Sequence, residues 1–439
     1  PIFSAGLLTM SSRNAPAQQP GAGNPALVVT LGQALFFDTN LSTPAGMSCA
    51  TCHSPTAGFS SPNSLANLIL GTMPGAVFGR FGNRKPPTVS YAAYIPVGPP
   101  TLNGKQYVGG MFYDGRTDDL TTQAQMPLQN PNEMNNLVHN VGSPALIVAE
   151  VQKGPYAALF KQAYGEDVFK EPTAQVFQLI AQSIAAYESS PAVSPFNSLY
   201  DAYVAGKAAF TSDQMAGLQL FTGTLNGRPG GPAAPVNATC STCHSIASAP
   251  GAGPDLFTNS GYKNIGTPKN PLNPYYFMTN ANSDPVGYNA LGTKYIDYGL
   301  GDYLYTNAAD EAADPLAVDG MFKTPTCRNV DARPNPWFVK QYGHNGVFKS
   351  LGEIVHFYNT RNLTTVPGEV IDFTQPNPYA NLQGKPLWPA PEYMGNLNNA
   401  SGTAGRLGNL GLTPTQEAQL VEFLKTLTDG YTLPRPGRP

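Results

Sequence analysis

Cys49-Ala50-Thr51-Cys52-His53 and Cys240-Ser241-Thr242-Cys243-His244 are the two stretches around which this chain is organised. Each is a C-x-x-C-H motif, the pattern of covalent c-type haem attachment. Two thiols at this spacing can reach the two vinyl groups on one edge of a porphyrin, and the histidine that follows can turn its imidazole onto the iron. The sequence therefore predicts two covalent haems c, with four cysteine attachment sites and with His53 and His244 as iron ligands.

Zinc binding and disulfide formation are the two alternatives for these cysteines. Zinc-binding cysteine pairs usually lie within a few tens of residues of each other, whereas these motifs begin at residues 49 and 240. A disulfide would leave the histidine after each second cysteine unexplained. Cys327 is the fifth cysteine and has no partner left within the chain, so we expect no structural disulfide framework.

The composition indicates a folded protein of two domains. The chain has 439 residues, a formal net charge of −3 and only 12% charged residues, which gives no indication of a nucleic-acid partner or of an anionic membrane surface. Its 45 glycines and 43 prolines, beside 41% hydrophobic residues, indicate long ordered loops. No stretch has the length and apolar continuity of a membrane span.

The location of the protein is expected to be outside the cytoplasm. The chain begins at Pro1, with neither a basic leader region nor an initiator methionine, so we expect that a leader has been removed. Haem c is normally attached outside the cytoplasm. The sequence therefore predicts a periplasmic or cell-surface protein and does not distinguish between these two locations.

A short internal repeat precedes both haem motifs. Gly32-Gln33-Ala34-Leu35-Phe36 and Gly217-Leu218-Gln219-Leu220-Phe221 share the pattern G-x-x-L-F, which favours a duplicated helical unit. Between them, apolar residues recur at helical spacing over residues 173–190 and predict an amphipathic helix. We expect a mostly α fold with little β: an N-terminal arm (1–30), two c-type cytochrome domains (31–205 and 206–439), each around one covalent haem, and loop insertions at 262–310 and 363–408.

Several further segments resemble the bacterial di-haem cytochrome c peroxidase/MauG family. They are Phe112–Arg116, Gln123 with Asn130–Met134, Lys323–Thr326, Arg328–Val330, His344–Gly346 and Phe357–Asn359. Each segment is short, but the combination is specific and extends from about residue 30 to 430. The resemblance implies that the first domain holds the peroxidatic haem and the second domain the electron-transfer haem.

The first haem is expected to be five-coordinate. In the peroxidase branch of this family, a mobile histidine caps the peroxidatic haem in the resting enzyme. Here no histidine occurs between His53 and His139, so residues 54–112 cannot supply one. We therefore expect this haem to be open to hydrogen peroxide without reductive activation.

Tyr358 is the candidate third iron ligand. It stands where the peroxidase branch has a methionine on the second haem and where MauG has a tyrosine. Leu351, Ile354, Val355 and Tyr358 follow helical spacing, so Tyr358 lies on the buried face of a helix, and a core tyrosine is the alternative. His356 faces elsewhere and is expected to be a surface or core residue.

Two more positions depart from the family pattern. Tyr113 stands where the family usually has a tryptophan between the haems. It can serve as an electron-hopping station, and a packing aromatic is the alternative. Lys85 stands where the family often has an asparagine that helps to hold calcium, and an ammonium group cannot donate an oxygen ligand. The resemblance therefore leaves calcium possible but doubtful.

The resemblance also implies the catalytic groups. Glu133 is expected to shuttle a proton between the oxygens of hydrogen peroxide, and Gln123 to hold these oxygens by hydrogen bonds; helix-surface residues are the alternative for both. The function expected is a peroxidase that receives electrons through the second haem from a small cytochrome c or cupredoxin. Two alternatives stay open: a MauG-like oxidant of protein side chains through a high-valent di-haem state, and a di-haem electron carrier without peroxidase turnover.

Overall fold

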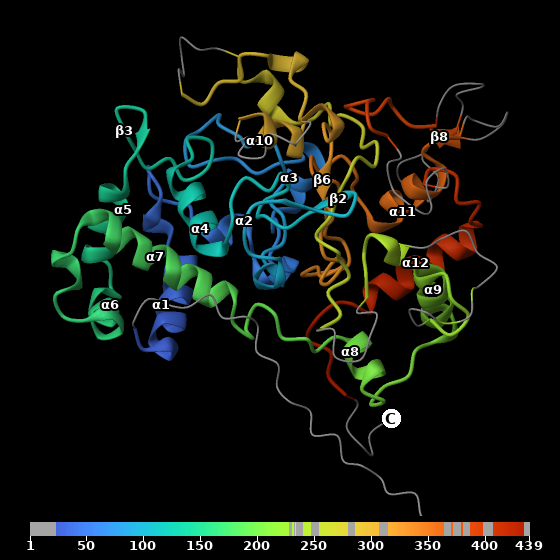
Figure 1. Ribbon diagram of the computed structural model, residues 1–439, viewed down its shortest axis with the longest axis horizontal. Helices are drawn as coiled ribbons and strands as arrows, with labels where there is room; N and C mark the ends of the chain where they lie inside the picture. Colours follow the sequence, from blue (N-terminus) through green and yellow to red (C-terminus); the bar gives the residue numbers. More distant parts are fainter. Residues whose placement is uncertain are drawn as a thin grey trace, which may run out of the picture.

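The fold is mostly helical with little strand (Figure 1). The computed structural model describes residues 23–227, 231, 233, 240–246, 254–279, 286–306, 315–363, 370–371, 379–380, 387–397 and 407–433. The helices are α1 (Pro25–Phe37), α2 (Cys49–Cys52), α3 (Ser64–Ile69), α4 (Leu120–Gln129), α5 (Pro144–Lys153), α6 (Ala157–Tyr164), α7 (Thr173–Glu188), α8 (Leu199–Val204), α9 (Ser212–Thr222), α10 (Leu300–Thr306), α11 (Leu351–Thr360) and α12 (Pro414–Lys425).

The strands form short antiparallel pairs. These are β1 (Thr101–Asn103) with β2 (Gln106–Val108), β3 (Leu137–Val138) with β4 (Val141–Gly142), β5 (Tyr262–Lys263) with β6 (Phe322–Lys323), and β7 (Val370–Ile371) with β8 (Tyr379–Ala380). Within the described ranges, no helix has both the length and the apolar character that crossing a bilayer requires.

The helices that build the two cores begin at local signals in the sequence. Asn24 caps α1, since its side-chain oxygen accepts a hydrogen bond from the amide of Ala26. Thr211 and Thr413 cap α9 and α12, each in a reciprocal pair with a glutamine three residues later. Proline at the first position of α1 and of α12 fits the same rule, because its missing N–H would have no partner there.

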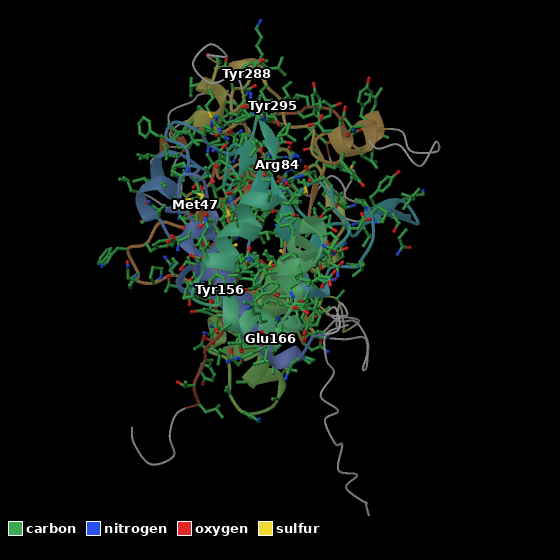
Figure 2. The ribbon with its side chains drawn as sticks, turned by 90° about the vertical axis from the view of Figure 1, so that its left-hand side faces the viewer. Met47, Arg84, Tyr156, Glu166, Tyr288 and Tyr295 are labelled. Carbon is green, nitrogen blue, oxygen red and sulfur yellow. The ribbon has the colours of Figure 1, made fainter. Side chains whose placement is uncertain are left out.

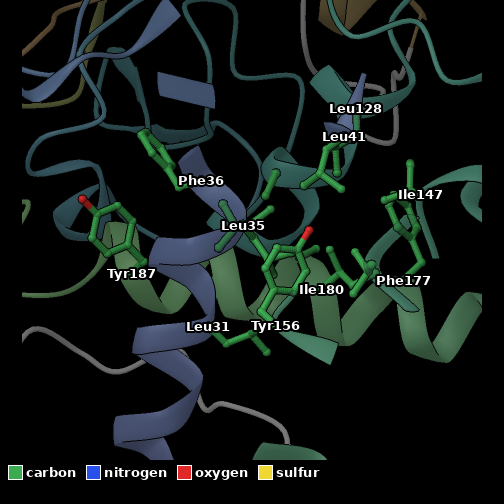
Figure 3. Packing of buried hydrophobic residues seen from close by; sticks show 14 of the residues in the cluster. Leu31, Leu35, Phe36, Leu41, Leu128, Ile147, Tyr156, Phe177, Ile180 and Tyr187 are labelled. Atoms are coloured by element: carbon green, nitrogen blue, oxygen red, sulfur yellow. The ribbon is translucent and has the colours of Figure 1, made fainter. Parts of the chain in front are cut away.

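The two largest hydrophobic cores of the described residues lie in different parts of the chain. The first extends from Val28 to Val193 and packs α1, α4, α5, α6 and α7 together; Figure 3 shows part of it. The second extends from Tyr200 to Leu427 and contains α9, α11 and α12. Tyr200 of α8 already lies in the second core, whereas the predicted boundary follows residue 205; the division into two cytochrome c domains stays a prediction.

The same helix crossing occurs in both cores. α1 packs on α7, and α9 packs on α12. A Cβ atom added to Gly32 would collide with the carbonyl oxygen of Ser183, and one added to Gly217 would collide with the carbonyl oxygen of Gln419. The glycine at the start of each G-x-x-L-F segment therefore allows two helix backbones to touch, which is the physical reason for the repeat.

Aromatic rings pack in the same way around each crossing. The Phe36 ring lies 6.3 Å from that of Phe59 and 5.3 Å from that of Tyr187. In the second core the Phe221 ring lies 5.8 Å from that of Phe257 and 5.1 Å from that of Phe423. These repeated contacts support the duplication that the sequence indicates.

Replacing Gly217 with alanine is expected to lower the free energy of unfolding by about 3 kcal/mol, because the added methyl group would push α9 away from α12. Gly352 in α11 is the matched control, since a methyl group there would meet nothing nearer than 3.9 Å and alanine is favoured over glycine in a helix by about 1 kcal/mol. Urea denaturation followed by circular dichroism compares the two variants with the unchanged protein. A Gly217→Ala variant as stable as the unchanged protein would contradict the close crossing.

Three predicted segments differ from the structure or extend beyond the described residues. Residues 25–30, assigned to an N-terminal arm, form the first turns of α1, because Asn24 and Pro25 start the helix earlier than the apolar pattern indicated; residues 1–22 lie outside the described residues. The predicted insertion at 262–310 contains β5 and α10, so it is more ordered than a plain loop. Of the insertion at 363–408, the structure describes 363, 370–371, 379–380, 387–397 and 407–408.

Candidate functional site

Each C-x-x-C-H motif forms a single helical turn. In α2 the amide of His53 donates to the carbonyl of Cys49 at 2.8 Å, and in the second motif the amide of His244 donates to that of Cys240 at 2.9 Å. Residues three apart on such a turn lie on the same side, so each pair of thiols faces one way. The histidine ends the turn, which frees its side chain to point elsewhere.

Both motif histidines are held through Nδ1. His53 Nδ1 lies 3.3 Å from the carbonyl oxygen of Phe59, and His244 Nδ1 lies 3.2 Å and 3.1 Å from those of Phe257 and Pro325. A carbonyl only accepts, so Nδ1 carries the proton and Nε2 keeps its lone pair, the arrangement that an iron ligand needs. Burial lowers the pKa of His53 to about 4 and also lowers that of His244, so both imidazoles are neutral.

A second internal repeat holds these histidine loops in place. Thr88 donates a hydrogen bond to the carbonyl of Gly58 at 2.7 Å, and Thr326 donates to that of Leu256 at 2.5 Å. The two threonines end the segments Lys85–Thr88 and Lys323–Thr326, which share the pattern K-x-P-T. The first segment, expected only as a calcium motif, therefore has a supporting role, and its match to the second segment is the sequence signal for that role.

A cavity of about 270 Å³ contains the second motif and Tyr358. Cys240, Cys243 and His244 line it together with a mostly apolar wall from α9, α11 and α12. The lining residues of α11 are Leu351, Ile354, Val355 and Tyr358, the set that the helical spacing predicted. Two thiols, a neutral imidazole and a phenol in an apolar wall suit a covalent haem.

The Tyr358 phenol is protonated in the absence of a metal. Burial raises its pKa, and the nearby thiols of Cys327, Cys243 and Cys240 raise it further. A coordinated metal ion is the kind of charge that can remove such a proton. Met278 and Met321, whose thioether sulfurs could also bind iron, are absent from the described lining of this cavity. The buried His356 contacts Glu417 of α12 at 3.0 Å.

Helix α4 of the first unit, the part of the chain around the first core, corresponds to α11 of the second unit, the part around the second core. The two helices differ at the position of Tyr358. Met111 pairs with Thr117, and Tyr342 pairs with Phe348, and in both cases a ten-residue helix begins three residues later, α4 or α11. The offset between the two helices is 231 (351 minus 120). Tyr358 then corresponds to Pro127 (358 minus 231), and Ile354, which lines the cavity, corresponds to Gln123 (354 minus 231).

Glu133 lies beside the first motif. It is half-buried and close enough to Cys49 and Cys52 to raise the pKa of both thiols. Burial raises the pKa of Glu133 itself, although Arg116 and the Asn130 side chain oppose this shift. A carboxyl group with a raised pKa is a stronger proton acceptor than an ordinary carboxylate.

Tyr113 lies between the two units. It is buried, and it lines the 270 Å³ cavity together with Ser60, Lys85 and Thr88 of the first unit. The Lys85 ammonium lies 5.6 Å from the centre of the Tyr113 ring and 3.4 Å from the carbonyl oxygen of Pro86. In the described part of the chain, no three His, Cys, Asp or Glu side chains form a group that could hold a metal ion.

The thiols are not of the activated kind that disulfide exchange uses. Burial raises the pKa of Cys52 and of Cys240 to about 12, whereas reactive cysteines have lowered pKa values. Cys327 is also buried, with its sulfur 3.1 Å from His244 Nδ1. No local pattern in the sequence links Cys327 to a haem motif, because 83 residues separate it from His244.

Comparisons with known proteins agree on one family. The family model described as "Di-haem cytochrome c peroxidase" matches residues 26–209. The methylamine utilization protein MauG of Paracoccus denitrificans is 33% identical over 417 residues, which cover 94% of this chain and 91% of that protein. The cytochrome-c peroxidase IdrP2 of Denitromonas iodatirespirans is 27% identical over 369 residues, with 81% and 80% coverage.

Solved structures of similar proteins share this fold. The diheme peroxidase BthA from Burkholderia thailandensis matches with a TM-score of 0.67 and 29% identity, covering 93% of this chain and 87% of that one. A MauG-like protein associated with microbial copper homeostasis shares the fold, with a TM-score of 0.58 and 22% identity over 93% of this chain and 91% of that one. With a relative this similar over nearly its whole length, the chain belongs to the di-haem cytochrome c peroxidase/MauG family.

Proposed function

We propose that this protein reduces hydrogen peroxide at an open, five-coordinate haem in its first unit, and that a second haem in its second unit relays the electrons. The correspondence of Pro127 with Tyr358 carries this proposal. The proline side chain has no atom that can bind iron, whereas a phenol oxygen can, so this helix position would supply a ligand to the second haem and none to the first. Each haem is bound through the cysteines of one motif and through His53 or His244.

The haems, once bound, supply the iron on which the O–O bond is broken and the oxidising equivalents are stored. The chain supplies the proton movement. Glu133 takes a proton from one peroxide oxygen and returns it to the other, which leaves as water. Gln123 donates hydrogen bonds to the peroxide oxygens and stays neutral throughout. The raised pKa of Glu133 supports this role, because burial makes its carboxylate a stronger proton acceptor.

A second candidate function is the MauG-like oxidation of protein side chains. Tyr358 favours it, because a phenolate ligand stabilises the higher oxidation states of iron, whereas a methionine ligand raises the potential and favours the ferrous state. The near full-length similarity to MauG of Paracoccus denitrificans is consistent with this branch. Tyr113, buried between the two units, is the proposed station for electron exchange between the haems.

The remaining assignments follow from this function. Hydrogen peroxide is the substrate, and a small cytochrome c or cupredoxin is the electron donor in the peroxidase branch, or a protein is the substrate in the MauG-like branch. The protein acts in the periplasm or at the cell surface. Its two cytochrome c domains divide between Val193 and Tyr200. Calcium stays doubtful, because Lys85 brings a positive charge where the family has an amide.

Peroxide consumption by the holoprotein tests the proposal. With a reduced small cytochrome c as donor, we expect two donor molecules to be oxidised for each peroxide consumed. Cyanide should bind the first haem without prior reduction and stop this turnover. A holoprotein that exchanges electrons with the donor but leaves peroxide intact would instead be an electron carrier.

A further inference from the structure

A buried chain of polar side chains links the 262–310 segment to the wall of the large cavity. The Tyr276 hydroxyl donates to Glu392 Oε1 at 3.3 Å, and Glu392 Oε2 lies 3.8 Å from His344 Nε2. Tyr276 is 3% exposed, and the side chains of His344 and Glu392 are 5% and 4% exposed. These three residues are far apart in the sequence, and nothing in the proposed peroxide reaction uses them.

The facing atoms of Glu392 and His344 are both without hydrogen-bond partners. Glu392 Oε2 and His344 Nε2 are buried, and each lacks a partner among the described residues. Burying such atoms unpaired costs free energy. A cavity of about 10 Å³, bordered by both side chains, lies next to them, with room for about one water molecule. Glu392 therefore has one oxygen that faces the Tyr276 hydroxyl and a second oxygen that faces His344 and the small cavity, and each can take up a proton.

Stacked rings connect the polar side chains of Tyr276, Glu392 and His344 to the large cavity. The His344 ring stacks on that of Phe322 with a centroid separation of 3.6 Å and an angle of 10° between the planes. Both side chains line the 270 Å³ cavity that holds His244 and Tyr358. A series of close contacts therefore connects Tyr276 with this cavity: the hydrogen bond to Glu392, the 3.8 Å approach of Glu392 to His344, and the stacked rings of His344 and Phe322.

On its other side, Tyr276 belongs to a group of tyrosines that leads outward. Its ring lies 6.3 Å from that of Tyr295, which lies 5.2 Å from that of the half-buried Tyr275. Figure 1 shows this segment in gold at the edge of the molecule, and Figure 2 labels Tyr295 in the same region as Arg84. Arg84 is paired with Asp297 at 2.7 Å, so its charge is already compensated.

The charges around Tyr276 require its proton and electron to leave together. The Lys269 ammonium lies 4.4 Å from the centre of the Tyr276 ring and disfavours a positive charge there. Burial, with Glu392 and Asp297 nearby, raises the pKa of the phenol, so it stays protonated at rest. Only the Glu392 carboxylate is within hydrogen-bond reach of the hydroxyl proton in the described structure, and it is a proton acceptor.

We propose that Tyr276, with Glu392 as proton acceptor and His344 as the connection to the large cavity, is a redox-active tyrosine that stores an oxidising equivalent. This inference rests on the proposed peroxide reaction, which supplies the oxidant. The O–H bond of Tyr276 breaks, its proton passes to Glu392, and its electron passes to the oxidised haem centre, which is reduced by one electron. A neutral tyrosyl radical remains until a donor returns the electron and Glu392 returns the proton.

Freeze-quench electron paramagnetic resonance of the holoprotein tests the assignment. Peroxide is added to the diferric protein, prepared once with ordinary and once with ring-deuterated tyrosine, so that a tyrosyl signal is recognised by its narrowing. We expect this signal to be lost in Tyr276→Phe and to persist in Tyr305→Phe, since Tyr305 is 79% exposed in the same segment. Glu392→Gln keeps a hydrogen-bond acceptor but takes up no proton, so the signal should also be lost there with Tyr276 present.

The outcomes separate this inference from the proposed function. If the haem spectra respond to peroxide and the tyrosyl signal survives in Tyr276→Phe, the assignment to Tyr276 is wrong. If the signal survives in Glu392→Gln, Glu392 is not the proton acceptor, and the proposed site is overturned. If the haem spectra of the unchanged protein do not respond to peroxide at all, the peroxide reaction fails and the inference falls with it.

Discussion

Replacing Glu133 with glutamine is expected to slow the reaction with hydrogen peroxide by roughly 10²–10⁴-fold, the usual contribution of general acid–base assistance. Glutamine keeps the size and the hydrogen-bonding capacity of glutamate but cannot move a proton. Because Glu133 lies near the first motif but is neither an attachment cysteine nor an iron ligand, both haems should stay bound. Stopped-flow absorption at the haem band gives the rate constant directly.

A surface carboxylate provides the control for this variant. Glu166, labelled in Figure 2, has a side chain that is 82% exposed on the first unit, so Glu166→Gln should react with peroxide at the unchanged rate. If Glu133→Gln also keeps the unchanged rate, Glu133 is not the proton shuttle. Its raised pKa would then reflect burial alone.

Replacing Tyr358 with methionine is expected to raise the reduction potential of the second haem by several tenths of a volt, because the axial ligand sets haem potentials over about 0.8 V. The anionic phenolate favours ferric iron, whereas the neutral thioether favours ferrous iron. The oxidised product formed with peroxide should also decay faster, since the second haem would no longer hold an oxidising equivalent. Spectroelectrochemical titration measures the potential of each haem separately.

Tyr358→Phe is the matched comparison, because it keeps the ring and removes only the oxygen. We expect its second haem to lose the distal ligand and to become high-spin. If both variants leave the potential and the spectrum of the second haem unchanged, Tyr358 is a core tyrosine. The MauG-like branch of the proposed function would then lose its support.

The features that the sequence predicted well depend on local patterns. The amphipathic helix expected over residues 173–190 is α7, Thr173–Glu188, because its apolar spacing is fixed by the helix period itself. The cavity-facing set on α11 was predicted for the same reason. The G-x-x-L-F repeat indicated a duplication, which the matching contacts of Gly32 and Gly217 support.

The features that the sequence did not reveal depend on contacts between distant residues. The hydrogen bond of Tyr276 to Glu392 joins residues 116 positions apart, and no local pattern marks either partner. The correspondence of Pro127 with Tyr358 became visible only when the paired residues before α4 and α11 fixed the offset between the two helices. The early start of α1 was missed because Asn24 and Pro25 lie outside the apolar repeat that was used to locate the helix.

The resting electron paramagnetic resonance spectrum of the oxidised holoprotein tests the central claim most directly. That claim is that one iron is open to peroxide, opposite Pro127, and that the other is capped by Tyr358. We expect one high-spin and one low-spin ferric haem in equal amounts, with cyanide converting only the high-spin signal. Two low-spin ferric haems at rest would show that both irons are capped and would contradict the proposed open peroxide site.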